Sequence, residues 1–219
     1  MTAVPIATIL LAAGEASRYG SPKQLLQIEG LPMVRRAAQA AVEAGTRVVV
    51  VTGAHRMQVE ACLHGLDLAC SFNASWRQGM GGSIAHGIGH VRRAMPPASA
   101  CIVMLADQPA IHAADLRRFI AAAATAPQRI IAACYGGITG APCLFPRGYF
   151  GELEALSGDR GARMLIRRHA QCVDELSVPD AALDIDTAED YSRYARTPAV
   201  ASPNGMPNRE RIAGNTRKL

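Results

Sequence analysis

The sequence predicts an α/β fold, in which helices cover both faces of one doubly wound and mostly parallel sheet. Two apolar runs, residues 4–11 and 47–52, are almost unbroken, which is typical of parallel strands buried on both faces. Such runs alternate along the chain with segments of helical periodicity. A length of 219 residues allows one sizeable core, and the alternation leaves no room for a second domain.

The first half of the chain follows this alternation closely. Residues 32–44 place apolar side chains at helical spacing and are followed by Gly45, a common helix terminator. The valine-rich run at 47–52 is a second buried strand, and Ser83 is a suitable N-cap for a later helix. The expected elements are the strand 4–11, the helix 32–44, the strand 47–52, the helix 55–64, the strand 66–72, the loop 73–82, the helix 83–95 and the strand 100–105.

The second half continues with shorter elements. The pair Gly136-Gly137 predicts a turn between two strands. The expected elements are the helix 113–124, the strand 129–134, a strand near 142–145, helical stretches at 149–156 and 161–169, the strand 173–176 and a last helix at 188–194.

The first strand leads into a glycine-punctuated loop that carries two fixed cations. Residues 10–23 are Leu-Leu-Ala-Ala-Gly-Glu-Ala-Ser-Arg-Tyr-Gly-Ser-Pro-Lys. Gly14 lets backbone N–H groups approach an anion, and Arg18 and Lys23 can neutralise phosphate oxygens. The spacing is neither that of a P-loop nor that of a dinucleotide fold. We therefore predict a loop that holds a nucleoside triphosphate; the alternative is that both cations are ordinary surface residues.

Composition excludes several classes of protein. The six cysteines show no Cys-x-x-Cys spacing and follow no signal peptide, so we expect neither a zinc site nor disulfides. No apolar run is long enough to span a bilayer, and we expect a cytoplasmic protein with no membrane partner. The net charge of +5 lies largely near the C-terminus, and no basic stripe with interleaved aromatics suggests nucleic-acid binding.

The C-terminal segment differs from the rest in composition. Residues 197–219 mix proline, glycine and asparagine without apolar periodicity, which predicts a disordered tail after a domain at 1–196. Contact of this tail with a partner is the alternative.

Five further motifs follow the first loop along the chain. They are Gly79-Met80-Gly81-Gly82-Ser83, Leu105-Ala106-Asp107-Gln108-Pro109, the run 140–146, Gly158-Asp159-Arg160-Gly161-Ala162-Arg163 and Asp184-Ile185-Asp186-Thr187. With the first loop, they make the chain resemble the MobA-like nucleotidyltransferases, which have a Rossmann-like fold, over roughly residues 5–195. The Ala12-Ala13-Gly14 form resembles cytidylyltransferases, and the nearest subgroup joins CMP from CTP to molybdopterin. Ala141 and Ala188 depart from the pattern of many relatives.

The resemblance implies a role for each motif. Asp107 and Asp186 would bind Mg²⁺, and Arg18 and Lys23 would contact the triphosphate, which together form the catalytic set. Asp159 and Arg163 lie in a polar, glycine-bounded segment that opens a helix, which suits the phosphate of a molybdopterin-type acceptor, and ordinary helix capping is the alternative. A client molybdoenzyme is a further partner that the resemblance implies. The nucleotide would be bound by Ala12, Ala13, Gly14, Gly79, Gly82 and Ser83.

Each of these roles has a structural alternative. Asp107 follows an apolar strand, where aspartate is often a turn former or a helix cap. Asp184 shares one face of an extended segment with Asp186 and could replace it as the ligand. His86 and His90 stand at i, i+4 spacing but lack a third ligand, which favours an exposed helix face over a metal site. A transferase with another nucleotide or acceptor, and a non-catalytic protein that delivers the cofactor, are the alternative functions.

Overall fold

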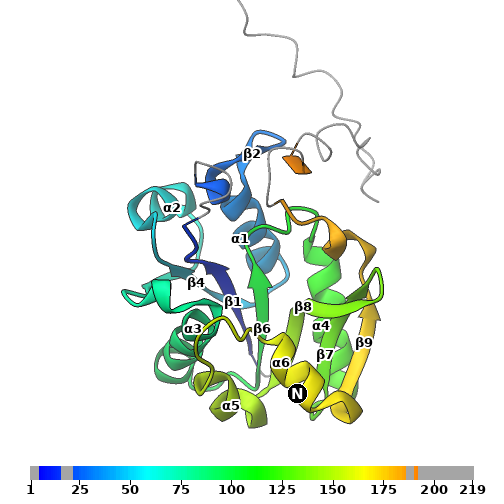
Figure 1. The fold of residues 1–219 in the computed structure, drawn as a ribbon. Helices are drawn as coiled ribbons and strands as arrows, with labels where there is room; N and C mark the ends of the chain where they lie inside the picture. Colours follow the sequence, from blue (N-terminus) through cyan, green and yellow to red (C-terminus); the bar gives the residue numbers. More distant parts are fainter. Residues whose placement is uncertain (1–4, 16–21, 186–189, 192–219) are drawn as a thin grey trace, which may run out of the picture.

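The computed structural model describes residues 5–15, 22–185 and 190–191. Within these residues, seven strands form one sheet in the order β5-β4-β1-β6-β8-β7-β9, and β2 and β3 form a small separate pair (Figure 1). All neighbours in the large sheet are parallel except β8, which is antiparallel to both β6 and β7. The strands are β1 (Ile6–Ala12), β2 (Gln27–Ile28), β3 (Leu31–Pro32), β4 (Arg47–Thr52), β5 (Ala69–Phe72), β6 (Ala100–Leu105), β7 (Ile130–Tyr135), β8 (Ile138–Pro146) and β9 (Val173–Ser177).

Helices cover both faces of this sheet. One face packs against α1, α2 and α4, and the opposite face against α3, α5 and α6 (Figure 1). The predicted doubly wound, mostly parallel fold is thereby confirmed. The helices are α1 (Met33–Glu43), α2 (Arg56–Leu63), α3 (Met80–Ala94), α4 (Ala113–Thr125), α5 (Phe150–Glu154) and α6 (Arg163–Arg168).

The apolar runs of the sequence become the centre of the sheet. In β1, Ile9 and Leu10 are both fully buried, and they point into the cores on opposite faces. A central strand with helices on both sides favours apolar residues on both of its faces, which explains why the run shows no alternation. Among the described residues, no helix combines the length and the apolar character that a membrane crossing requires.

The strand expected at 66–72 is shorter, since β5 begins at Ala69, and two further predicted elements differ in a way that bears on the site. The helix expected from Ser83 begins three residues earlier as α3, with Gly79 as its N-cap, so the prediction of Ser83 as N-cap is wrong. Gly79 has φ +104° and ψ 178°, a conformation that glycine alone adopts readily, and this fixes the helix start. Ser83 lies in the first turn and is buried, where its Oγ accepts a hydrogen bond from Asn73 Nδ2 at 3.2 Å.

The second difference is β8, which is longer than the strand expected near 142–145 and runs against its neighbours. The predicted turn at Gly136-Gly137 is present, and both glycines have positive φ. Because this tight turn joins β7 directly to β8, the two strands form a hairpin inside an otherwise parallel sheet. The predicted last helix at 188–194 lies outside the described residues apart from Asp190 and Tyr191, and the tail at 197–219 lies outside them entirely.

Candidate active site

The candidate site lies at the carboxyl edge of the parallel strands. Strands β1 and β6 are neighbours, with Leu11 opposite Leu105, so their following loops leave the sheet side by side. The backbone N–H of Ala106 donates to the carbonyl of Leu11 at 3.1 Å and extends this pairing beyond the strands. Open α/β sheets bind ligands at such an edge.

An ion pair joins the first loop to the loop after β6. Lys23 Nζ lies 2.7 Å from Asp107 Oδ2, and the two side chains are 16% and 20% exposed. The other carboxylate oxygen, Asp107 Oδ1, is buried and has no hydrogen-bond partner among the described residues. A buried carboxylate oxygen without a donor is costly to desolvate, and it has the chemistry of a ligand for a hard cation.

The backbone of Ala13 and Gly14 is fixed by its neighbours. Ala54 N donates to the Ala13 carbonyl at 3.1 Å, and Gln24 Nε2 donates to the Gly14 carbonyl at 2.7 Å. A Cβ placed on Gly53 would overlap the carbonyl oxygen of Ala13, so the two segments are in close contact. Ala12 and Ala13 are buried, whereas Gly14 is exposed at the edge. The loop therefore presents a fixed backbone at the point where the sequence predicts a nucleotide.

Gln108 connects three segments behind Asp107. Its Nε2 donates to the carbonyls of Ala141 at 3.1 Å and Ala181 at 2.9 Å, and the residue is only 3% exposed. Next to it, the backbone N–H of Ile185 donates to the carbonyl of Asp107 at 3.1 Å. These bonds hold the segment that leads to Asp184 and Asp186 against the end of β6.

The predicted metal ligands are only partly described. Asp107 is at the sheet edge, while Asp186 and the predicted triphosphate contact Arg18 lie outside the described residues. Asp184 is exposed, and Ile185 beside it is buried, as expected for an extended segment with alternating faces. Within the described ranges, no three His, Cys, Asp or Glu side chains are grouped so that they could hold a metal ion.

One histidine of the α3 pair contacts the edge strand of the sheet. His86 Nε2 lies 2.9 Å from Ser71 Oγ on β5. Burial, followed by the charge of Arg93, lowers the pKa of both His86 and His90. The contact with Ser71 gives His86 a hydrogen-bond partner on the edge strand β5.

Two motifs far apart in sequence pack directly on each other. The backbone N–H of Gly81 donates to the carbonyl of Gly158 at 2.8 Å. A Cβ on Gly79 would overlap the same carbonyl group and would lie 2.6 Å from Asp159 Oδ1. Gly82, in contrast, has open space where a Cβ would stand. The loop at 157–160 thus packs on the start of α3, and the side chain of Asp159 lies against Gly79.

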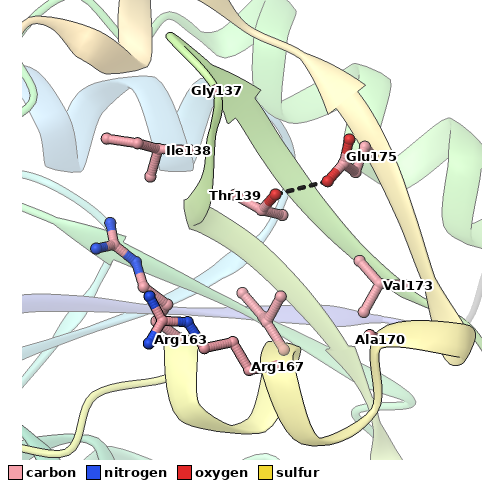
Figure 2. A pocket seen from close by; sticks show the side chains of 9 residues that line it. Gly137, Ile138, Thr139, Arg163, Arg167, Ala170, Val173 and Glu175 are labelled. Atoms are coloured by element: carbon pink, nitrogen blue, oxygen red, sulfur yellow. Dashed lines mark hydrogen bonds between the residues drawn. The ribbon is translucent and has the colours of Figure 1, made fainter.

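Arg163 reaches from α6 across the face of the sheet toward β8 (Figure 2). A Cβ on Gly140 would stand 3.3 Å from Arg163 Nη2 and 3.2 Å from the hydroxyl oxygen of Tyr135. Burial raises the pKa of Tyr135, and the nearby guanidinium of Arg163 opposes the rise. Gly140 precedes Ala141, the partner of Gln108, so Arg163 borders the same edge of the sheet as Asp107.

Sequence reasoning did not single out Gln24 and Gln108. Each directly follows a predicted site residue, Lys23 or Asp107, and each is 3% exposed. A polar residue adjacent to a candidate catalytic residue was the available signal. The side chains of Gln24 and Gln108 both donate to backbone carbonyls, and no sequence pattern identifies such partners.

We predict that Gln108→Ala lowers the free energy of unfolding by about 2 kcal/mol, because two buried hydrogen bonds are lost and two carbonyls lose their donor. Urea unfolding followed by circular dichroism measures this difference. Gln58→Ala, at an exposed position on α2, is the matched control and should change stability little. A Gln108→Ala protein as stable as the unchanged chain would show that the amide does not hold these segments together.

Comparison with known proteins finds one matching family and several similar proteins. The model of the MobA-like NTP transferase domain family matches residues 8–173. The purine catabolism protein PucB of Bacillus subtilis (strain 168) is 28% identical over 204 residues, which cover 86% of this chain and 95% of that protein. The crystal structure of Rv0371c from Mycobacterium tuberculosis H37Rv has 31% sequence identity and a TM-score of 0.75, covering 88% of this chain and 98% of that one. A structure of Rv0371c in complex with manganese has 30% identity and a TM-score of 0.71, covering 88% and 99%.

Proposed function

Because this chain belongs to the family of MobA-like NTP transferase domains, we propose that it transfers CMP from CTP to the phosphate of molybdopterin and releases pyrophosphate. The observation that carries the proposal is the ion pair of Lys23 with Asp107 beside the exposed backbone of Gly14. It places one cation and one carboxylate at the sheet edge where a triphosphate would bind.

The proposed step joins two phosphates. An oxygen of the acceptor's phosphate attacks the α-phosphorus of CTP and forms a new P–O bond. The bond from that phosphorus to the bridging oxygen breaks, and pyrophosphate leaves with the electron pair. The attacking group is already an anion, so positioning and charge stabilisation contribute more than proton transfer. Lys23 and Arg18 would neutralise the triphosphate, and the Gly14 backbone would hold it in place.

A divalent cation, Mg²⁺ in this proposal, fits the residues that are present. Asp107 Oδ1 is buried without a hydrogen-bond partner among the described residues, as a metal-binding oxygen would be before the metal is bound. Asp186 would supply a second carboxylate, with Asp184 as the alternative. When bound, the cation would lower the charge of the triphosphate and of the leaving pyrophosphate. The manganese complex of Rv0371c supports a divalent metal in a similar protein.

The choice of CTP rests on Ala12-Ala13-Gly14. Ala13 is buried against Gly53, and its carbonyl is held by Ala54 N. The Ala13 methyl group therefore acts mainly by fixing the position of the backbone that would face the base. A glycine at this position would remove that contact and leave more room, as a larger purine base would require.

We predict that the protein releases pyrophosphate with CTP, molybdopterin and Mg²⁺ at least tenfold faster than with GTP. Ala13→Gly should reduce this preference, and each tenfold of discrimination corresponds to about 1.4 kcal/mol. A coupled pyrophosphate assay over the four nucleoside triphosphates measures both values. Ala155→Gly, an exposed position after α5, is the control and should keep the preference. Equal or faster turnover with GTP would contradict the base assignment, and no turnover with any nucleotide would contradict the acceptor.

A further inference from the structure

An open pocket lies on the α6 side of the sheet, next to the β7–β8 hairpin (Figure 2). Its volume is about 610 Å³, which is in the range of small-molecule sites. The α6 wall is cationic, the hairpin and β9 form the other wall, and apolar side chains lie between them. The residues that line these walls include Ile138, Thr139, Arg163, Arg167, Val173 and Glu175.

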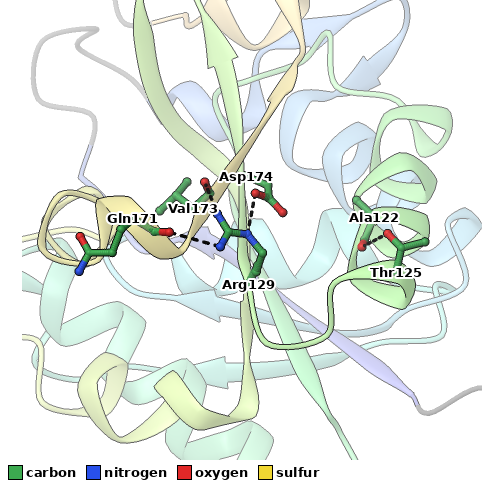
Figure 3. A network of polar contacts seen from close by, with 6 residues as sticks. All are labelled: Ala122, Thr125, Arg129, Gln171, Val173 and Asp174. Atoms are coloured by element: carbon green, nitrogen blue, oxygen red, sulfur yellow. Dashed lines mark hydrogen bonds and ion pairs between the residues drawn. The ribbon is translucent and has the colours of Figure 1, made fainter.

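The two arginines of this pocket differ in their ion pairing from Arg129 and Arg168 nearby. Arg129 donates to Asp174 Oδ1 at 2.6 Å and to two backbone carbonyls (Figure 3), and Arg168 is paired with Glu152 at 3.1 Å. Within the described part of the chain, neither Arg163 nor Arg167 has a carboxylate within ion-pair distance.

Arg163 and Arg167 stand at i, i+4 on one face of α6, where like charges repel each other. Both side chains line the same pocket. Two guanidinium groups that line one cavity, whose carboxylate Glu175 lies on the opposite wall and is bound by Thr139, match the charge and the donor pattern of a phosphate dianion. The pair therefore favours a phosphorylated ligand over a neutral one.

The opposite wall carries an acceptor of hydrogen bonds. Glu175 on β9 is exposed, and one of its oxygens, Oε1, accepts a hydrogen bond from Thr139 Oγ1 at 2.6 Å (Figure 2). This bond orients the carboxylate, which keeps further acceptor capacity for N–H groups of a ligand. Val173 and the exposed Ile138 add apolar surface to the lining.

Arg163 lies between the pocket and the candidate active site. The guanidinium lies over Gly140, whose neighbour Ala141 accepts a hydrogen bond from Gln108, the residue after Asp107. A phosphate held by Arg163 would thus border the edge where the triphosphate is expected. The rest of the same molecule could extend along β8 toward Glu175.

We propose that this pocket is the acceptor subsite, and this inference rests on the proposed function. Arg163 and Arg167 bind the acceptor's phosphate, and Glu175, oriented by Thr139, accepts hydrogen bonds from N–H groups of a heterocycle. The ligand class is a phosphate monoester that carries an amino-substituted ring. Arg167, Thr139 and Glu175 are thereby assigned as binding residues in addition to Arg163.

The test separates binding from turnover. Equilibrium titration with molybdopterin, without nucleotide, gives the Kd of the full-length protein and its variants, and the pyrophosphate assay gives KM for each substrate. Arg167→Gln should raise the Kd and the KM for molybdopterin at least tenfold and leave the KM for CTP unchanged. Glu175→Gln should raise the same two constants at least threefold. Arg168→Gln, the next residue on α6 and outside the pocket, is the charge-matched control and should leave them unchanged.

The outcomes distinguish the two proposals. If the unchanged protein turns over molybdopterin and Arg167→Gln has the same Kd and KM, the subsite assignment is wrong and the proposed function stands. If molybdopterin binds and the binding depends on Arg167, but no nucleotide is transferred to it, the proposed function is wrong and the subsite stands. An equal loss of binding in Arg168→Gln, or no saturable binding to the unchanged protein, would also overturn the subsite.

Discussion

Asp107→Ala should lower kcat by about 100- to 1,000-fold, the usual cost of losing a group that stabilises charge in a transition state. The substitution removes a carboxylate at the junction of the β1 and β6 loops that forms an ion pair with Lys23. It also removes the buried oxygen that we propose for the metal. The pyrophosphate assay at rising Mg²⁺ concentration measures the effect, and circular dichroism verifies the fold.

The matched control is Asp67→Ala, an exposed carboxylate remote in sequence from every site residue, which should retain full turnover. Near-normal rates of Asp107→Ala at saturating Mg²⁺ would refute its role in catalysis. The companion variant Asp186→Ala should lose a similar factor. If only Asp184→Ala does so, the second ligand is Asp184.

Gly79→Ala should lower the free energy of unfolding by about 2 to 3 kcal/mol, the upper range for backbone strain at one residue. Gly79 has a conformation that disfavours any side chain, and its Cβ would overlap the backbone of Gly158. To accommodate it, the loop at 157–160 would have to move away from α3. Urea unfolding measures the loss, and a raised KM for the acceptor would report the displaced loop.

Gly82→Ala is the matched control for stability, since it lies in the same motif with open space around its Cβ position. It should leave stability unchanged or raise it, because alanine is the better helix former. Equal stability of the two variants would mean that the contact between the motifs contributes little. The KM of Gly82→Ala for CTP separately reports whether this position faces the nucleotide.

The sequence was sufficient to predict the fold class and the position of Asp107. Buried parallel strands such as β1 and β4 have a local signature, a continuous apolar run. A residue that follows such a strand must lie at the carboxyl edge, so the proximity of Lys23 and Asp107 follows from topology. These features follow from the local sequence, together with the rule that connections between parallel strands are right-handed.

The remaining features depend on contacts between distant segments. Nothing near Ser83 indicates that α3 begins at Met80, because the conformation of Gly79 is set together with the loop at 157–160. The reversed direction of β8 was not predicted, although Gly136-Gly137 was identified as a turn. The acceptor pocket likewise combines a hairpin, a short helix and an edge strand. No single periodicity describes such a surface.

The antiparallel hairpin has a consequence for how this scaffold could diverge. Side chains alternate between the two faces of a strand, and the distal half of β8 is locked between β6 and β7, so the position of Thr139 along β8 fixes the face on which it lies. The hairpin tip is exposed at Gly136 and Gly137. Residues inserted at this tip would lengthen the turn without changing the face of Thr139. Insertions there could thus reshape one wall of the pocket while the nucleotide loop and the central strands stay as they are.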